Sequence, residues 1–65
     1  MEGRVRTLDA EAHDFRYLRI RKGISVREAA KRMNVPVTTV MRVELGHAPI
    51  PEGWLREMEE MRGNR

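Results

Sequence analysis

The chain has 65 residues, a net charge of +3, no cysteine, 40% hydrophobic residues and only 5% aromatic residues. This length predicts one small domain whose modest core is built from short helices with local contacts. The lack of cysteine excludes disulfides and cysteine-bound metal. No apolar run approaches the roughly 18 residues of a membrane span and no signal-peptide pattern is present, so we expect a cytoplasmic protein.

Residues 1–6 have little pattern, and we expect a flexible N-terminal arm there. The first helix is predicted at about residues 8–22. Gly23 offers a left-handed stop, and the preceding basic pair suits a helix C-terminus. The apolar residues that recur at helical spacing are Leu8, Ala12, Phe15 and Leu18.

A second helix is predicted at about residues 25–33. Ser25 and Glu28 form a capping-box pattern at its start, and Asn34 suits a left-handed turn at its end. One face of this helix carries Val26, Ala29, Ala30 and Met33.

A third helix is predicted at about residues 36–45, with Pro36 in its first turn and Gly46 at its end. Its inward residues would be Val40 and Val43. A fourth helix is predicted at about residues 51–62, ended by Gly63. Its amphipathic stripe consists of Trp54, Leu55, Met58 and Met61.

Charge is unevenly distributed along the chain. Residues 15–47 contain eight basic and two acidic side chains, whereas residues 51–62 contain two basic and four acidic ones. A positive stretch of this kind favours a polyanionic partner, although solvated helix faces are the alternative interpretation.

The second and third helices together show the spacing of a helix-turn-helix. Ala29 and Ala30 are small enough for a close helix crossing, Val35 follows five residues later in the turn, and Val40 closes the third helix. The same spacing also arises by chance in unrelated helical hairpins.

With its flanking residues, the chain resembles the Cro/cI-type helix-turn-helix family of phage and bacterial repressors, also called the XRE family. The resemblance covers about residues 15–61. It implies an all-α, lambda-repressor-like DNA-binding domain of four or five helices over residues 7–63, encoded by a bacterium, phage or plasmid. The matching residues are Leu18, Arg19, Lys22, Gly23, Ile24, Ser25, Ala29, Ala30, Val35, Val40, Arg42, Val43, Glu44, Gly46 and Pro49, followed by the Trp54–Met61 stripe.

The chain departs from the family pattern in four ways. Val26 stands where Gln is common, Asn34 where Gly is common, and Pro36 where Ser or Thr is common. A fifth helix is common in the family, and its absence here would leave apolar surface for something else to cover. The change to Val26 puts in doubt the usual bracing of the first base contact.

The resemblance implies that the first half of the third helix contacts base edges in the major groove, through Val37, Thr38, Met41 and Arg42. Val37 and Met41 have no hydrogen-bonding groups and can recognise only thymine methyls or shape. Arg42 suits a bidentate contact with guanine. The alternatives are a phosphate contact for Arg42 and packing against a neighbouring side chain for Met41.

Contacts with the DNA backbone are expected near the starts of the second and third helices, because helix N-termini favour anions. Lys31 would add long-range attraction. Arg4 and Arg6 on the arm would enter a minor groove or remain solvated. The candidate backbone contacts are Val26, Arg27, Thr39, His47 and Arg16.

The family places an ion pair at the positions of Arg19 and Glu44, between the first helix and the end of the third. We expect the same pair here, with a structural role. We also expect the fourth helix either to cap the core or to pair with a second subunit. Tyr17, Ile20 and Ile50 are further apolar residues that a partner could cover.

The predicted function is sequence-specific binding of double-stranded DNA by a transcriptional regulator, a repressor acting as a homodimer on a palindromic operator. The alternative is an antitoxin or another protein-interaction component with the same fold, although the tail after the fourth helix is short. We expect no enzyme, because no paired acid/base or metal-ligand spacing is present. We likewise expect no metal, cofactor or small-molecule effector.

Overall fold

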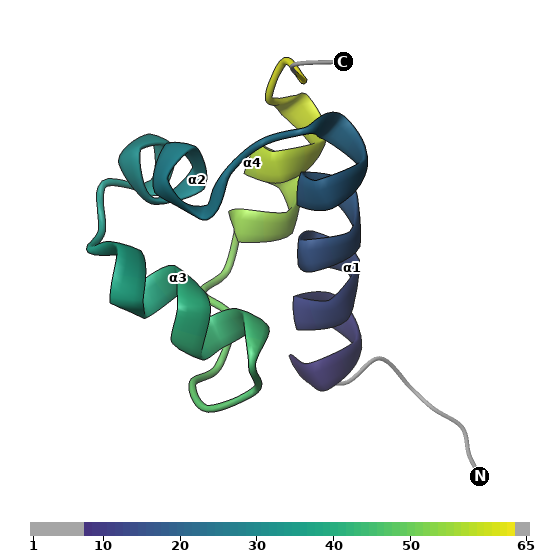
Figure 1. The fold of residues 1–65 in the computed structure, drawn as a ribbon. Helices are drawn as coiled ribbons and strands as arrows, with labels where there is room; N and C mark the ends of the chain where they lie inside the picture. The colour runs from purple at the N-terminus through teal and green to yellow at the C-terminus, as the bar shows by residue number, and fades with distance from the viewer. Residues whose placement is uncertain (1–7, 64–65) are drawn as a thin grey trace, which may run out of the picture.

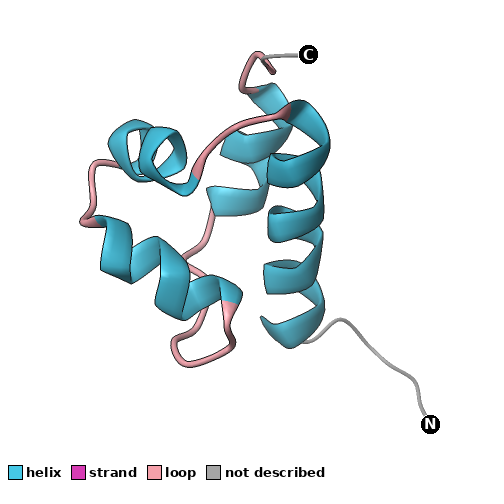
Figure 2. Ribbon diagram, viewed as in Figure 1, coloured by secondary structure: helices cyan, strands magenta, loops and turns pink. Residues whose placement is uncertain are grey.

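The computed structural model describes residues 8–63, which form four helices and no strand (Figures 1 and 2). The helices are α1 (Leu8–Lys22), α2 (Val26–Met33), α3 (Val37–Glu44) and α4 (Trp54–Glu60). α1 packs against α3 and α4, and α2 packs against the same two helices. The predicted arm, with Arg4 and Arg6, lies outside the described residues.

Local signals set the ends of the first two helices. α1 covers the predicted range, and Gly23 follows it with a φ of 73°. Ser25 caps α2: its hydroxyl accepts from the Glu28 amide at 3.0 Å, and the Glu28 carboxylate accepts from the Ser25 amide at 2.8 Å. Asn34 ends α2 in the left-handed region, with a φ of 61°. Both caps are the ones that the sequence predicts.

The two later helices are shorter than predicted. Pro36 is the N-cap of α3, with extended backbone, rather than part of its first turn. The prediction that the fourth helix spans residues 51–62 is wrong at both ends. It begins only at Trp54, because Gly53 has a φ of 92°, and it ends at Glu60, because Met61 is extended. Gly63 therefore does not terminate it.

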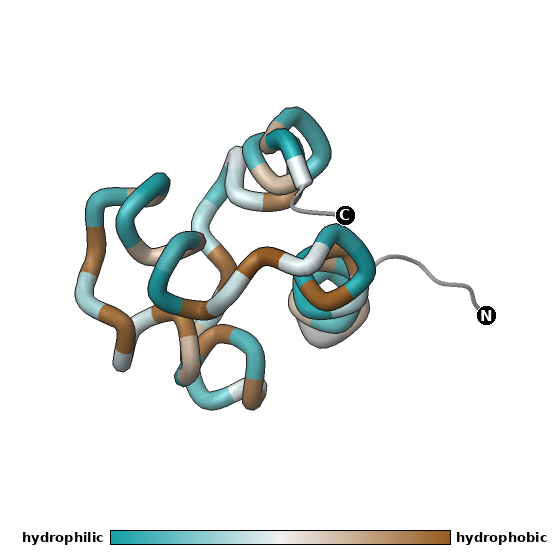
Figure 3. The backbone as a smooth tube through the Cα atoms, turned by 45° about the horizontal axis from the view of Figure 1, so that its top comes forward, coloured by the Kyte–Doolittle hydropathy of each residue, from teal (hydrophilic) through white to brown (hydrophobic). Residues whose placement is uncertain are grey.

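The core lies where the four helices meet. The rings of Phe15 and Trp54 pack in a tilted arrangement, with centroids 5.5 Å apart and an interplanar angle of 33°, which joins α1 to α4. Ile24, in the connection between α1 and α2, is also buried, and Figure 3 shows this hydrophobic stretch near the centre of the molecule. The fully buried or nearly buried residues are Ala12, Phe15, Ile24, Ala29, Ala30, Val40, Val43, Ile50, Trp54 and Met58. Ile50 is therefore a core residue, and the expectation that a partner covers it is wrong.

Lys22 connects the C-terminal end of α1 to the C-terminal end of α4 through hydrogen bonds. Its ammonium donates to the carbonyl oxygens of Met58, Glu59 and Met61 at 2.6, 2.7 and 2.9 Å. These carbonyls belong to the C-terminal end of α4, where a positive charge is stabilising. Gly63 packs so closely against Lys22 that an added Cβ would lie 2.9 Å from its carbonyl oxygen.

None of the four helices combines the length and the apolar character needed to cross a membrane.

Candidate nucleic-acid interface

The turn between α2 and α3 is short and closed by backbone hydrogen bonds. The Val35 amide donates to the Ala30 carbonyl at 3.0 Å, and the Asn34 amide donates to the Lys31 carbonyl at 3.2 Å. Val35 also packs against the core, as predicted for the turn. The backbone bonds therefore fix the turn onto the end of α2, and the apolar packing of Val35 joins the turn to the core.

α3 has an inward and an outward face. Val40 and Val43 are buried, with exposed fractions of 0% and 1%. Three of the four predicted base contacts, Thr38, Met41 and Arg42, are exposed on the outward face. Val37 differs: it is only partly exposed and packs against the core, so it has less surface to offer a partner than predicted.

The outward face also includes Leu45, which sequence reasoning missed. Leu45 is 65% exposed, the largest value among the exposed large hydrophobic residues of the described chain. It lies seven positions after Thr38 and four after Met41, so helical spacing places it on the same face. That spacing was a usable signal, but the family pattern directs attention to the first half of the helix.

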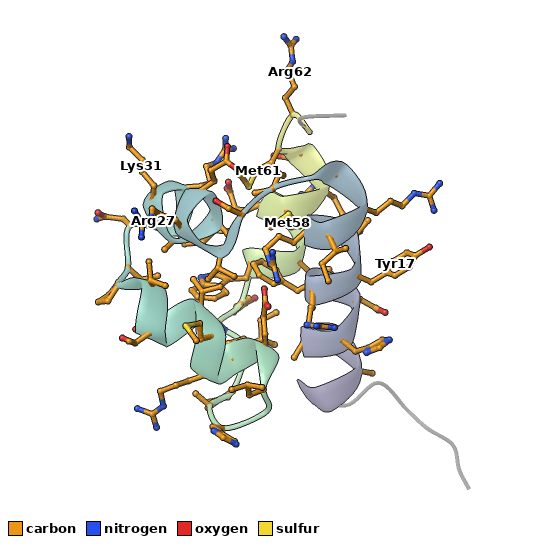
Figure 4. All side chains as sticks on the ribbon, in the orientation of Figure 1. Tyr17, Arg27, Lys31, Met58, Met61 and Arg62 are labelled. Carbon is orange, nitrogen blue, oxygen red and sulfur yellow. The ribbon has the colours of Figure 1, made fainter. Side chains whose placement is uncertain are left out.

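The basic residues of α2 divide between its two flanks. Arg32 faces α4, where its Nε donates to the Glu57 carboxylate at 2.8 Å. Arg27 and Lys31 lie one turn apart on the other flank, and both are exposed. Figure 4 shows Lys31 pointing away from α3, which suits a long-range contribution better than a direct contact beside α3.

The other predicted backbone contacts have mixed surroundings. His47 and Arg16 are exposed, whereas Val26 and Thr39 are partly buried. At the start of α2 the Glu28 carboxylate accepts a hydrogen bond from the Ser25 amide. A negatively charged group therefore lies where the sequence predicted a DNA phosphate. Arg16 lies beside the end of α3, with its Nε 4.0 Å from the Glu44 carboxylate.

Arg19 and Glu44 lie together, as expected. The Arg19 Nε and NH2 groups donate to the two oxygens of Glu44 at 2.6 and 2.9 Å, and NH1 donates to the Ile24 carbonyl at 3.0 Å. The two side chains are only 11% and 5% exposed. One guanidinium thus connects α1, the turn before α2 and the end of α3, and so orients the outward face of α3.

The charged side chains of residues 15–47 differ in their partners. Glu44 is paired with Arg19, and the exposed Glu28 carboxylate accepts a hydrogen bond from the Ser25 amide. By contrast, the side chains of Arg27, Lys31 and Arg42 make no hydrogen bond or ion pair with any other described residue. Their charges are available to an anionic partner.

Residues 8–63 contain no group of three or more His, Cys, Asp or Glu side chains arranged to hold a metal ion. An open hollow of about 390 Å³ lies between α1 and the end of α3 and is lined by Ala12, His13, Arg16, Glu44, Leu45 and Gly46. Comparison of the chain with protein families, with curated proteins and with solved structures finds no significant match.

Proposed function

We propose that this protein binds double-stranded DNA in a sequence-specific way and regulates transcription as a repressor. In this proposal α2 and α3 act as a lambda-repressor-like helix-turn-helix of the Cro/cI type. α3 enters the major groove, whose width of about 12 Å admits an α-helix.

The observation that carries the proposal is the pairing pattern of the charges on the α2–α3 side. Three cationic side chains there, Arg27, Lys31 and Arg42, make no hydrogen bond or ion pair with another described residue. Of the two nearby acids, Glu44 is paired with Arg19, whereas Glu28 is exposed and accepts a hydrogen bond from the Ser25 amide. Unpaired cations on and beside α3 attract a phosphate backbone, Arg42 directly and Lys31 at longer range. Glu57 of α4 pairs with Arg32 of α2, but no acid of α4 pairs with Arg27, Lys31 or Arg42.

Arg42 is the residue best suited to base recognition. It is exposed on the outward face of α3, and its guanidinium can donate two parallel hydrogen bonds to O6 and N7 of guanine. The Arg19–Glu44 pair at the end of the same helix supports this role, because it limits rotation of α3 and therefore the positions that Arg42 can reach.

The proposal includes a homodimer on a palindromic operator, because one short helix contacts too few base pairs to define a unique site. Sedimentation of the protein with an operator-length duplex tests this part. Two chains per duplex support the dimer, and one chain bound at saturation contradicts it.

The decisive experiment is selection of bound duplexes from a random DNA pool at a fixed, stated salt concentration. Enrichment of a palindromic sequence supports the proposal. Recovery of sequences no different from the input pool overturns sequence-specific binding.

A substitution then tests the α3 surface directly. Arg42→Ala should weaken binding to the selected sequence by about 1–3 kcal/mol and relax preference at one base position. The matched control is Arg56→Ala, which removes the same charge from an exposed position on α4. Equal weakening by both variants would mean that only net charge matters and that α3 does not read the bases.

A further inference from the structure

Met41, on the outward face of α3, and Leu45, the C-cap residue whose amide donates to the Met41 carbonyl, form an apolar ridge. The two residues are four positions apart, so their side chains are neighbours on the helix. They are 47% and 65% exposed. Thr38 continues the same face toward the start of the helix.

Positive charge borders this Met41–Leu45 ridge on two sides. Arg42 is exposed beside Met41, and Arg16 lines the same hollow as Leu45. The only acid of α3 is Glu44, whose side chain is 5% exposed and engaged by Arg19. The ridge therefore suits a partner that is negatively charged around a small apolar group.

A protein partner fits these observations less well. Stable protein interfaces bury at least about 1,200 Å² in total, far more than two side chains can supply. The other large exposed apolar residues, Tyr17 and Ile20, lie on α1, and Figure 4 shows Tyr17 pointing away from the other helices. They do not extend the ridge. Duplex DNA fits better, because the thymine 5-methyl is an apolar group on its major-groove edge, between two rows of phosphates.

We propose that Met41 and Leu45 form a thymine-reading ridge, with Leu45 as a specificity-determining residue beyond the first half of α3. This inference rests on the proposed DNA-binding function and specifies the chemistry of its target. The two side chains are about 6 Å apart along the helix, which corresponds to about two base-pair steps of roughly 3.4 Å. The preferred sequence should therefore contain two thymines about two steps apart in each half-site.

Replacement of thymine by uracil tests the proposal, because it removes only the 5-methyl group and leaves base pairing intact. The probe is the duplex recovered by selection, with uracil introduced at one thymine position at a time. Affinity is measured by fluorescence anisotropy at constant salt. We expect a loss of about fourfold at each of two positions in a half-site, equivalent to the burial of about one methyl-sized group.

Two variants assign each methyl to its side chain. With Leu45→Ala, affinity should no longer change on uracil replacement at one of the two positions, and with Met41→Ala at the other. Both residues are largely exposed, so circular dichroism should show folded proteins. The matched control is Ile20→Ala, which shortens an exposed apolar side chain on α1 and should leave both fourfold effects intact.

The outcomes separate this inference from the function on which it rests. If selection enriches no sequence, the proposed function fails. If a sequence is enriched but uracil has no effect, or if Leu45→Ala leaves both effects unchanged, DNA binding stands and the methyl-reading ridge is overturned. If Leu45→Ala leaves DNA affinity unchanged but abolishes self-association in the ultracentrifuge, the ridge is a protein contact and the inference is likewise overturned.

Discussion

The α2–α3 pair and the α1–α4 pair are built in different ways. The ends of α2, and the start of the turn to α3, are set by residues close in sequence: the Ser25–Glu28 cap and the left-handed Asn34. α1 and α4 are joined by residues far apart in sequence. Lys22 donates to carbonyls 36 to 39 positions away, and the Phe15 ring packs against the Trp54 ring.

The charges follow the same division. Arg27, Lys31 and Arg42 on α2 and α3 make no pair among the described residues, whereas Arg56 on α4 pairs with Glu60 and Lys22 on α1 caps α4. The division is not complete, because Arg32 of α2 pairs with Glu57 of α4, and Arg62, which follows α4, makes no pair among the described residues. In the proposed function, the α1–α4 pair is the platform and the α2–α3 pair is the surface presented to DNA. The four changes below test this division, beginning with the largest expected effect.

Glu44→Ala should remove the Arg19–Glu44 ion pair, the main polar contact between the α1–α4 helix pair and the α2–α3 helix pair. It leaves the Arg19 guanidinium, whose side chain is 11% exposed, without its carboxylate, and removal of one partner of a buried pair costs at least about 3 kcal/mol. Urea unfolding followed by circular dichroism measures this loss. A free energy of unfolding within about 1 kcal/mol of the parent protein would mean that the pair does not hold α3.

Lys22→Met should weaken the α1–α4 platform while keeping the apolar part of the side chain. Loss of three bonds to carbonyls at the end of α4 should cost about 1.5 kcal/mol, because hydrogen bonds from a charged donor are stronger than neutral ones. The same unfolding experiment measures it. Lys31→Met is the matched control, since Lys31 makes no such contact among residues 8–63, and equal effects from both variants would contradict a specific role for Lys22.

Asn34→Ala tests the left-handed backbone conformation that ends α2 and begins the turn to α3. Alanine disfavours the left-handed backbone at φ 61°, so the variant should lose about 1 kcal/mol of stability. Asn34→Gly is the companion variant and should be neutral or slightly stabilising at this position, because glycine has no Cβ to strain. Equal melting temperatures for the Ala and Gly variants would argue against conformational strain as the reason for asparagine here.

Glu57→Ala should have the smallest effect. The Arg32–Glu57 pair links α2 to α4, but both side chains are 45% exposed, and exposed pairs contribute at most about 1 kcal/mol. A shift of less than about 0.5 kcal/mol in unfolding free energy is expected. A loss comparable to that of Glu44→Ala would show that exposure is a poor guide to the strength of ion pairs in this protein.

Sequence reasoning was most accurate where a few adjacent residues decide the outcome. Three features were predicted correctly: the range of α1, the cap of α2 and the turn at Asn34. Each depends on the backbone preference or hydrogen bonding of residues within one helical turn. It was least accurate at α4. The residues from Pro51 onward permit a helix, but the backbone turns at Gly53 and bends away again at Met61.

The candidate site shows the same limit. The sequence predicted that Val40 and Val43 point inward, and the family resemblance implied outward roles for Val37, Thr38, Met41 and Arg42; the structure agrees except at Val37. The sequence did not reveal that Val37 packs against the core or that Leu45 is more exposed than Met41. Those two properties depend on which neighbouring helix covers each end of α3, and helical periodicity within a single element carries no such information.

The sequence by itself determined that the chain is helical, where α1 and α2 begin and end, and which side of α3 faces inward, because caps, glycines and periodic apolar residues act over short distances. Only the tertiary structure decided that Lys22 closes α4, that Arg32 pairs with Glu57, and that Arg27, Lys31 and Arg42 have no partner among the described residues. Pairing of charges depends on distances in space between residues that are remote along the chain. No local pattern specifies those distances until the helices have packed.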